Sequence, residues 1–159
     1  MKILVADTSP LISLLLIDKL SVLTTLYAEI YIPLEVWNEL NTHLEITVFQ
    51  KQLQVLENFV RTVDIPFYAA QIDKGELEAI ALYKQMNADL LLIDDKKARE
   101  IAEANNINCI GTLAILIKAK HNKLLPLLQP VFLDLLSKKR FYQKELLNNL
   151  LSNEGEELI

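Results

Sequence analysis

The sequence is poor in the residues from which several kinds of functional site are built. Its 159 residues include one cysteine, two histidines and three glycines. Cys109 alone cannot form a disulfide within the chain, and with so few histidines a zinc site of thiolate and imidazole ligands is poorly supported. Three glycines do not supply a phosphate-binding loop. We therefore expect a protein of the reducing cytoplasm without disulfides, zinc or a nucleotide-binding loop.

The sequence also lacks a long apolar run and an excess of positive charge. The apolar run that begins at Leu11 ends before Asp18 and Lys19, well short of the roughly 18 residues of a membrane span. The first residues do not show the pattern of a secretory signal. The net charge is −5, so the overall charge does not indicate a nucleic-acid-binding protein. We expect no membrane association, and any phosphate-binding site must be local.

What the chain does contain is a regular alternation of apolar segments. Hydrophobic residues make up 52% of it, which suits a well-packed protein. Short apolar runs predict strands, and segments with helical spacing follow them. The predicted strands are 3–6, 29–33, 60–65, 89–93 and 107–110. The first predicted helix begins at residue 10, and the others span 33–40, 48–59, 75–86, 96–105 and 113–121, the last of them capped by Thr112. This order predicts an α/β protein, a three-layer α/β/α fold with a central parallel sheet.

The chain from Leu124 onward has a different character. It is leucine-rich, is predicted to be helical and contains two prolines, so we divide the chain into an α/β domain at 1–123 and a C-terminal helical extension at 124–159. Four leucines form a broad apolar stripe on the last predicted helix: Leu146, Leu147, Leu150 and Leu151. The stripe either packs on the preceding domain or binds a partner, and both interpretations stay open.

Acidic residues follow two of the predicted strands. Asp7 follows the first strand, and Asp94 and Asp95 follow the fourth. The carboxyl ends of parallel strands meet at one edge of a sheet, where ligands bind in open α/β folds. Helix capping is the alternative for Asp7 and for one of the other two. Ser9, which precedes a proline, already suits the capping role in the first helix.

Two glutamates lie on helix sides that include apolar residues. Helical spacing places Glu76 on the side of Ala79, whereas Glu78 lies on a more polar side. Glu39 borders an apolar stripe on its own helix. A carboxylate on an apolar side needs a partner or a task, because an unpaired charge is costly to bury. The structural alternatives are a capping box of Asp73 with Glu76, and a solvated helix face for Glu39.

Carboxylates gathered at one edge would raise one another's pKa by repulsion. A hard divalent cation removes that penalty, and Mg²⁺ prefers oxygen ligands and keeps several of its waters. The sequence therefore predicts a cation site at this edge, formed by four acids: Asp7, Glu39, Glu76 and Asp94.

These segments together resemble a known family. The first strand ending in "DTS", the helix "VWNEL" and the run "GELEAIALY…ADLLLIDD" are similar to the PIN-domain nucleases, and most similar to their small prokaryotic branch of VapC-type toxins. The likeness runs from Lys2 to about Lys120, and the tail resembles the helical extension of one PIN-like branch. The chain departs from the family pattern by a glutamate at the third acid and by "LIDD" where Thr-x-Asp is common.

The resemblance implies a ribonuclease that cleaves RNA phosphodiesters with Mg²⁺ or Mn²⁺. The family's acids fall on four residues, which would be both metal ligands and catalytic residues: Asp7, Glu39, Glu76 and Asp94. Five neighbours would support the ligands or contact the substrate: Thr8, Ser9, Asp95, Lys96 and Lys97. The resemblance further implies a homodimer and a small antitoxin partner, as in toxin–antitoxin pairs.

Two other functions compete with this interpretation. A catalytically reduced PIN-like module that binds RNA or regulates is compatible with Glu76 and with the negative net charge. A phosphatase of the haloacid dehalogenase type also begins with a strand ending in an acid, but it needs a second aspartate where this chain has Ser9. The basic runs, of which Lys138–Arg140 is the densest, are more often solvated faces than RNA-binding surfaces.

Overall fold

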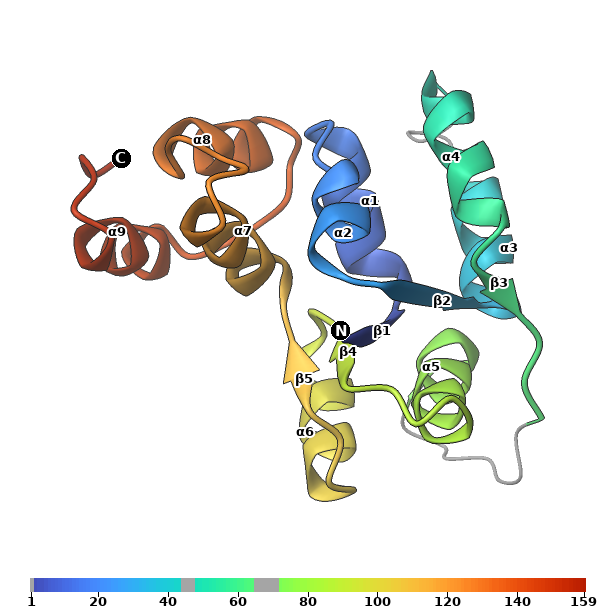
Figure 1. Cartoon of the computed structure of the whole chain (residues 1–159). Helices are drawn as coiled ribbons and strands as arrows, with labels where there is room; N and C mark the ends of the chain where they lie inside the picture. The colour runs from blue at the N-terminus through green and yellow to red at the C-terminus, as the bar shows by residue number, and fades with distance from the viewer. Residues whose placement is uncertain (1, 44–47, 65–71) are drawn as a thin grey trace.

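A five-stranded parallel sheet forms the middle of the molecule (Figure 1). The structure is a computed structural model that describes residues 2–43, 48–64 and 72–159. The strands lie in the order β3-β2-β1-β4-β5. Their bounds are β1 (Ile3–Ala6), β2 (Glu29–Pro33), β3 (Val60–Arg61), β4 (Leu90–Leu92) and β5 (Cys109–Ile110). The predicted α/β fold with a central parallel sheet is confirmed.

The order of the strands reverses at β1. The chain builds β2 and β3 on one side of β1 and then returns to place β4 and β5 on the other side. The register pairs Leu4 with Ile30 on the first side and Ala6 with Leu92 on the second. In open α/β sheets, ligands bind beyond the carboxyl ends of the strands at such a reversal. This topology therefore marks the ends of β1 and β4 as the place to look for a site.

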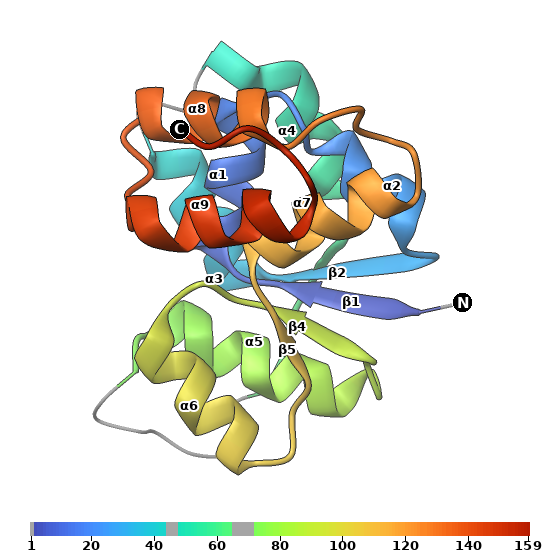
Figure 2. The same ribbon diagram turned by 90° about the vertical axis from the view of Figure 1, so that its left-hand side faces the viewer.

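Helices cover both faces of the sheet (Figure 2). In that view α5 and α6 lie below the sheet, and α1, α2, α7, α8 and α9 lie above it. The helices are α1 (Thr8–Leu16), α2 (Ser21–Leu26), α3 (Leu34–Thr42), α4 (Gln50–Glu57), α5 (Lys74–Gln85), α6 (Lys96–Ala104), α7 (Thr112–His121), α8 (Gln129–Ser137) and α9 (Lys144–Asn153). In the described ranges, no helix has both the length and the apolar character that a membrane span requires.

The two faces bury separate hydrophobic clusters because side chains alternate along a strand. Leu4 and Ala6 of β1 join the larger cluster, whereas Val5 between them joins the smaller one under α5 and α6. In the same way Leu92 of β4 faces the larger cluster and Leu91 the smaller. Strands buried on both faces read as continuous apolar runs, which is why the sequence located them.

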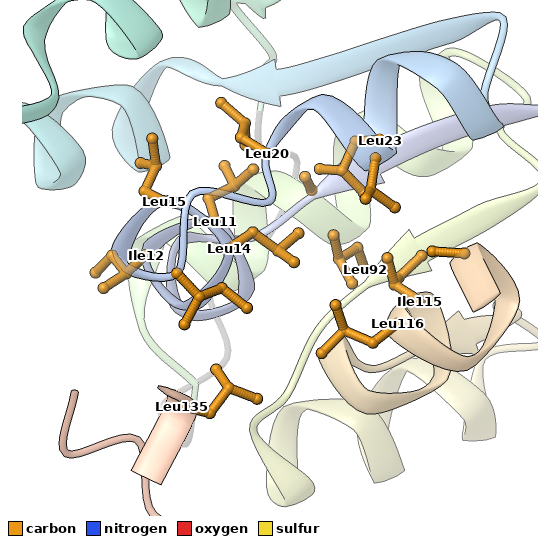
Figure 3. Packing of buried hydrophobic residues seen from close by; sticks show 14 of the residues in the cluster. Leu11, Ile12, Leu14, Leu15, Leu20, Leu23, Leu92, Ile115, Leu116 and Leu135 are labelled. Atoms are coloured by element: carbon orange, nitrogen blue, oxygen red, sulfur yellow. The ribbon is translucent and has the colours of Figure 1, made fainter. Parts of the chain in front are cut away.

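Helix α1 is the centre of the larger cluster. Six consecutive residues of α1, Pro10–Leu15, are buried, as expected for a helix that is apolar on all sides. Figure 3 shows α1 in end view, with Leu14 directed towards Leu92 of β4 and Ile115 of α7, which belong to the same cluster as Leu135 of α8. Burial of each large side chain stabilises the fold by roughly 1.5–3 kcal/mol. This packing fixes the start of α1, which carries Asp7 at its N-cap position.

The C-terminal extension shares this cluster. Phe132 is fully buried in it, together with Leu147 and Leu151 of the predicted leucine stripe. Leu150 packs at its edge, and Leu146 is 44% exposed. The stripe therefore packs on the α/β core, which is the first of the two interpretations. The boundary at residue 123 stays a prediction.

A buried acid near the C-terminus fastens the extension. The Glu156 carboxylate accepts hydrogen bonds from the backbone N–H groups of Leu128 and Gln129, at 2.8 Å each. Lys120 of α7 lies 2.8 Å from the same carboxylate, whose side chain is 4% exposed. One acid thus supplies acceptors for the start of α8 and a counter-ion for α7.

Four local predictions need correction. Pro33 ends β2 at the N-cap of α3 instead of opening the helix. Ser9 lies inside α1, because the N-cap is Asp7. Thr112 is the first residue of α7 and does not cap it. The strand predicted over 60–65 covers only Val60–Arg61, and residue 65 lies outside the described residues. The short helix α2 was not foreseen.

Candidate active site

A cavity of about 390 Å³ opens where the strand order reverses. Of the described residues, six acids line the cavity: Asp7, Glu39, Asp73, Glu76, Asp94 and Asp95. Thr8, Ser9 and Ile12 line it as well. The structure therefore brings together the four acids that the sequence singled out, although Asp7 and Asp94 follow β1 and β4 whereas Glu39 and Glu76 belong to α3 and α5.

Asp7 is the most buried of these acids. It is 5% exposed and occupies the N-cap position of α1, yet its side chain makes no capping hydrogen bond. Its backbone N–H donates to the Leu92 carbonyl at 3.0 Å, which continues the β1–β4 pairing by one residue. Burial raises the pKa of Asp7 to about 7, and Glu76, Asp73 and Glu39 add repulsion, against a lowering by the Thr8 amide. Helix capping therefore does not account for Asp7.

Glu39 reaches the cavity from α3. The Thr8 hydroxyl donates a hydrogen bond to its Oε2 atom. Burial raises the pKa of Glu39, and the Thr8 hydrogen bond opposes that rise. A Cβ atom placed on Gly75 would lie 2.8 Å from Glu39 Oε1, so the glycine in the first turn of α5 leaves the space that this carboxylate occupies. Glu39 is therefore a held, half-buried group and not part of a solvated helix face.

Glu76 combines a structural and a candidate functional role. Its N–H donates to Asp73 Oδ1 at 2.8 Å, and its Oε2 accepts from the Asp73 N–H at 3.2 Å. The predicted capping box is thus confirmed. Burial and then Asp73 raise the pKa of Glu76 to about 6. Its Oε1 accepts no hydrogen bond from any described residue, so one oxygen remains for another role in the cavity.

Asp94 and Asp95 divide the tasks at the end of β4. Asp95 caps α6, because its Oδ1 accepts from the Ala98 N–H at 2.8 Å. Asp94 accepts from Thr112 at both oxygens, from N–H at 2.8 Å and from the hydroxyl at 2.7 Å. Tyr142 of the extension donates to Asp94 Oδ2 at 3.3 Å. The Thr112 hydroxyl therefore orients Asp94. Because the hydroxyl is used in this way, Thr112 does not cap α7.

The match to a family model now assigns the fold. A model described as a PIN domain matches residues 3–156. The chain belongs to the PIN-domain family. The resemblance to PIN domains predicted from the sequence is confirmed, while the VapC-type branch stays a prediction, and the match includes α8 and α9. PIN domains are generally nucleases, so this chain has a nuclease-type fold.

A solved structure supports the same fold. The PIN domain is similar to a PilT N-terminus domain protein from the hyperthermophilic archaeon Sulfolobus solfataricus P2, with a TM-score of 0.50 and 18% sequence identity. The similarity covers 74% of this chain and 92% of that chain. At this identity the likeness concerns the fold alone. A comparison with curated proteins finds no match.

The cavity of this PIN domain fits a hard divalent cation by its chemistry. Its donor atoms are carboxylate and hydroxyl oxygens, and the raised pKa values of Asp7, Glu39 and Glu76 show that their charges are poorly compensated. Among the described residues, no three histidine, cysteine or acid side chains are placed closely enough to form a closed ligand set. Mg²⁺ commonly uses one or two carboxylates and keeps several waters, so this open arrangement suits it.

Glu78 was misjudged from the sequence. It is 8% exposed, as buried as Glu76. Its Oε2 accepts from the Glu35 N–H at 3.0 Å, and Lys74 lies 3.9 Å from its Oε1. Glu78 therefore joins the start of α3 to α5 outside the cavity. Helical spacing within α5 could not show this, because the partner belongs to a neighbouring helix.

The predicted substrate-binding lysines lie at the start of α6. Lys96 and Lys97 are exposed and do not line the cavity, and Lys96 lies 3.8 Å from Glu100. Their role in substrate binding stays a prediction. The sequence analysis missed Tyr142 as a neighbour of Asp94, since no local pattern connects two residues 48 positions apart.

Proposed function

We propose that this PIN domain is a ribonuclease that cleaves RNA phosphodiesters with Mg²⁺ or Mn²⁺. One observation carries the proposal: Asp7, Glu39 and Glu76 hold uncompensated carboxylates around one cavity at the reversal point of the sheet. Burial of such charges is unfavourable unless a cation or a proton joins them. Their position at a ligand-binding edge favours the cation.

The chain holds each candidate ligand in place before any cation binds. Thr8 holds Glu39, Asp73 holds Glu76, and Thr112 with Tyr142 holds Asp94. Asp7 is held by its backbone, through the hydrogen bond to Leu92. Such second contacts orient ligands and raise their effectiveness. When bound, the cation supplies a water of lowered pKa and stabilises charge on the phosphate.

The four acids take distinct parts in this proposal. Asp7, Glu39 and Asp94 hold the cation directly or through water, and Glu76 ligates a second ion or orients the attacking water with its free Oε1. Two hydrogen bonds already occupy Asp94 Oδ2. Among the described residues Oδ1 accepts only the Thr112 N–H, so it is the oxygen left for a cation or its water.

Cleavage of a labelled single-stranded RNA tests the proposal. The protein should cleave it with Mg²⁺ or Mn²⁺ and not with EDTA. Asp7→Asn should lower the rate by roughly 100-fold or more, in line with the loss of a central electrostatic group. Asp18→Asn is the matched control, because Asp18 is exposed and has a φ of 52°, a backbone conformation that asparagine tolerates. Undiminished cleavage by Asp7→Asn would remove this residue from the mechanism.

A second candidate is a catalytically reduced PIN domain that binds RNA without cleaving it. It is favoured by the lack of a closed ligand set among the described residues. Such a protein should bind the labelled RNA and leave it intact with either cation. The cleavage assay therefore separates the two candidates.

The proposal includes a biological setting, supported by the family resemblance. The protein would be the toxin of a toxin–antitoxin pair, act in the cytoplasm, and pair with a small antitoxin and with a second copy of itself. A short open reading frame directly adjacent to its gene would favour the toxin role. Light scattering of the full chain measures the dimer directly.

A further inference from the structure

Arg140, in the connection between α8 and α9, reaches across to the start of α1. Its Nη2 donates to the Ser9 hydroxyl at 2.7 Å and to the Ser9 carbonyl at 3.2 Å. Its Nε donates to the Ser13 hydroxyl at 2.9 Å. Ser13 is fully buried and donates in turn to the Ser9 carbonyl at 3.1 Å. The guanidinium group is thus fixed against α1 by Ser13 and Ser9, which lie 127 and 131 positions away in the sequence.

The partners of Arg140 hold its geometry and leave its charge uncompensated. All of them are neutral oxygens, and within the described residues no carboxylate lies in ion-pair distance of it. Two other cations differ, since Lys74 lies 2.7 Å from Glu35 and Arg99 lies 3.2 Å from Glu103. Arg140 is also only half-buried, and its Nη1 donates to no described residue. A fixed guanidinium with a free edge is suited to an anion.

This charge lies beside the acidic cavity, next to a residue of its wall. Ser9, which accepts from Arg140, lines the cavity. Tyr142, two residues further on, reaches Asp94 on the β4 side. The connection between α8 and α9 therefore contacts the cavity wall at α1 and at the end of β4. A cation is needed here, because the acids that hold a metal would also repel the phosphates of a nucleic acid.

We propose that Arg140 binds a phosphate of the RNA substrate at the Ser9 side of the cavity. This inference rests on the proposed ribonuclease function and names the residue that compensates for the acidic surroundings. The two N–H groups of Nη1 remain to donate to phosphate oxygens, and the attachment of the guanidinium to Ser9 and Ser13 reduces the entropy lost on binding. The C-terminal extension thus contributes to substrate binding as well as to the core.

A purely structural role for Arg140 makes different predictions. If Arg140 only fastens the extension to α1, its replacement lowers the melting temperature but leaves the RNA affinity of the folded protein unchanged. A phosphate contact changes the affinity and its dependence on salt. For single-stranded nucleic acid, each contact contributes about 0.7 to the slope of log affinity against log salt concentration.

The test is binding of a fluorescein-labelled single-stranded RNA, measured by anisotropy at several salt concentrations. The full chain carries Asp7→Asn throughout, so that the RNA is not cut. Arg140→Gln should weaken binding roughly tenfold or more, as expected for a charge-assisted contact, and lower the slope by about 0.7. Lys138→Gln removes an equal, exposed charge two residues away and should leave affinity within about twofold, the range of a surface change.

The outcomes separate this inference from the proposed function. If the wild-type protein cleaves RNA but Arg140→Gln binds it with unchanged affinity and slope, the inference is wrong and the ribonuclease proposal stands. If the wild-type protein neither binds nor cleaves RNA, both fail. If Arg140→Gln does not fold, Arg140→Lys decides, because it keeps the charge but lacks the guanidinium that Ser9 and Ser13 hold at two nitrogens. Weaker binding than that of the parent supports the proposal, and equal affinity overturns the proposal that the held guanidinium makes the contact.

Discussion

Two groups of buried or part-buried acids in this PIN domain differ in the direction in which their pKa values are shifted. At the cavity, burial and then neighbouring acids raise the pKa of Asp7 and of Glu76. At the C-terminus, a hydrogen bond from His121 holds the pKa of Glu154 below its usual range. Burial would raise the pKa of Glu156, but Lys120 and two backbone amides outweigh it and lower that pKa.

The two groups differ in the partners that the chain supplies to them. The C-terminal acids have their cations and amide donors within the chain, so they stabilise the fold as it stands. The cavity acids have hydroxyl and amide donors that orient them, but among the residues that the structure describes none of them forms an ion pair with a cation inside the cavity. Carboxylates that are oriented but not neutralised are what the proposed cation site requires.

The largest expected effect is on the pH dependence of stability in EDTA. Because the pKa of Asp7 is raised from 3.8 to about 7, the folded protein keeps a proton that the unfolded chain loses, so stability should rise as the pH falls from 8 towards 5. Asp7→Asn should remove much of this dependence and raise stability at pH 8, by as much as about 4 kcal/mol from the pKa difference. Melting temperatures of both proteins across this range measure it.

A wild-type protein that loses stability as the pH falls from 8 to 5 would contradict this prediction. Below about pH 4.5 the C-terminal acids should reverse the trend. The lowered pKa values of Glu154 and Glu156 mean that their stabilisation is present above the ordinary value of 4.5 and is lost as the pH falls further.

The second prediction concerns the Glu156 carboxylate, which joins the end of the chain to the start of α8 and to Lys120. Glu156→Ala leaves the N–H groups at the start of α8 without their acceptor and Lys120 without a partner. The expected loss is about 2 kcal/mol, or roughly 4–8 °C in melting temperature for a chain of this size. Glu157→Ala, at the exposed neighbour, is the control. Equal melting temperatures for the two variants would show that Glu156 does not fasten the extension.

The third prediction concerns the space beside Glu39. Gly75→Ala places a methyl group 2.8 Å from Glu39 Oε1 and should displace that carboxylate. We expect Mn²⁺ affinity to fall several-fold, while helix propensity offsets the strain and keeps stability within about 1 kcal/mol. Gly155→Ala is the opposite control: it strains a residue at φ 68° with nothing near its Cβ, so stability should fall and Mn²⁺ affinity should not. The reverse pattern would rule out this explanation for Gly75.

The smallest expected effect is that of Tyr142→Phe. The variant removes one of three donors to Asp94, and the remaining two come from Thr112. At 3.3 Å the lost hydrogen bond is long, so stability should fall by about 0.5–1 kcal/mol, and cleavage should fall only a few-fold. Tyr83→Phe removes a hydroxyl that contacts Asn108 away from the cavity and should leave cleavage unchanged. A Tyr142→Phe protein with the cleavage rate of the wild type would show that Thr112 alone orients Asp94.

The sequence predicted what depends on local pattern and on strand order. Continuous apolar runs located β1 and β4, and parallel pairing then placed Asp7 and Asp94 at one edge. The capping box at Asp73 was predictable because it is contained in four consecutive residues. Features that depend on contact between distant elements were not predictable.

Three residues illustrate the features that depend on contact between distant elements. Glu78 appeared to lie on a polar side of α5, yet α3 covers it. Thr112 looked like a helix cap, but its hydroxyl binds Asp94 in a neighbouring loop. Arg140 was part of a basic run, and only the docking of the extension on α1 reveals its contacts with Ser9. In each case the partner lies more than 15 positions away in the sequence, where periodicity carries no information.

Thermal denaturation with added Mn²⁺ tests the central claim most directly. A cation at 100 times its dissociation constant adds about 2.7 kcal/mol of stability, so the melting temperature of the wild-type protein should rise by several degrees at pH 8 and by less at pH 6, where the raised pKa values let protons compete for Asp7 and Glu76. Asp18→Asn should behave as the wild type, and Asp7→Asn should show little or no rise. An equal rise in Asp7→Asn, or no rise in the wild-type protein at millimolar Mn²⁺, would contradict the account.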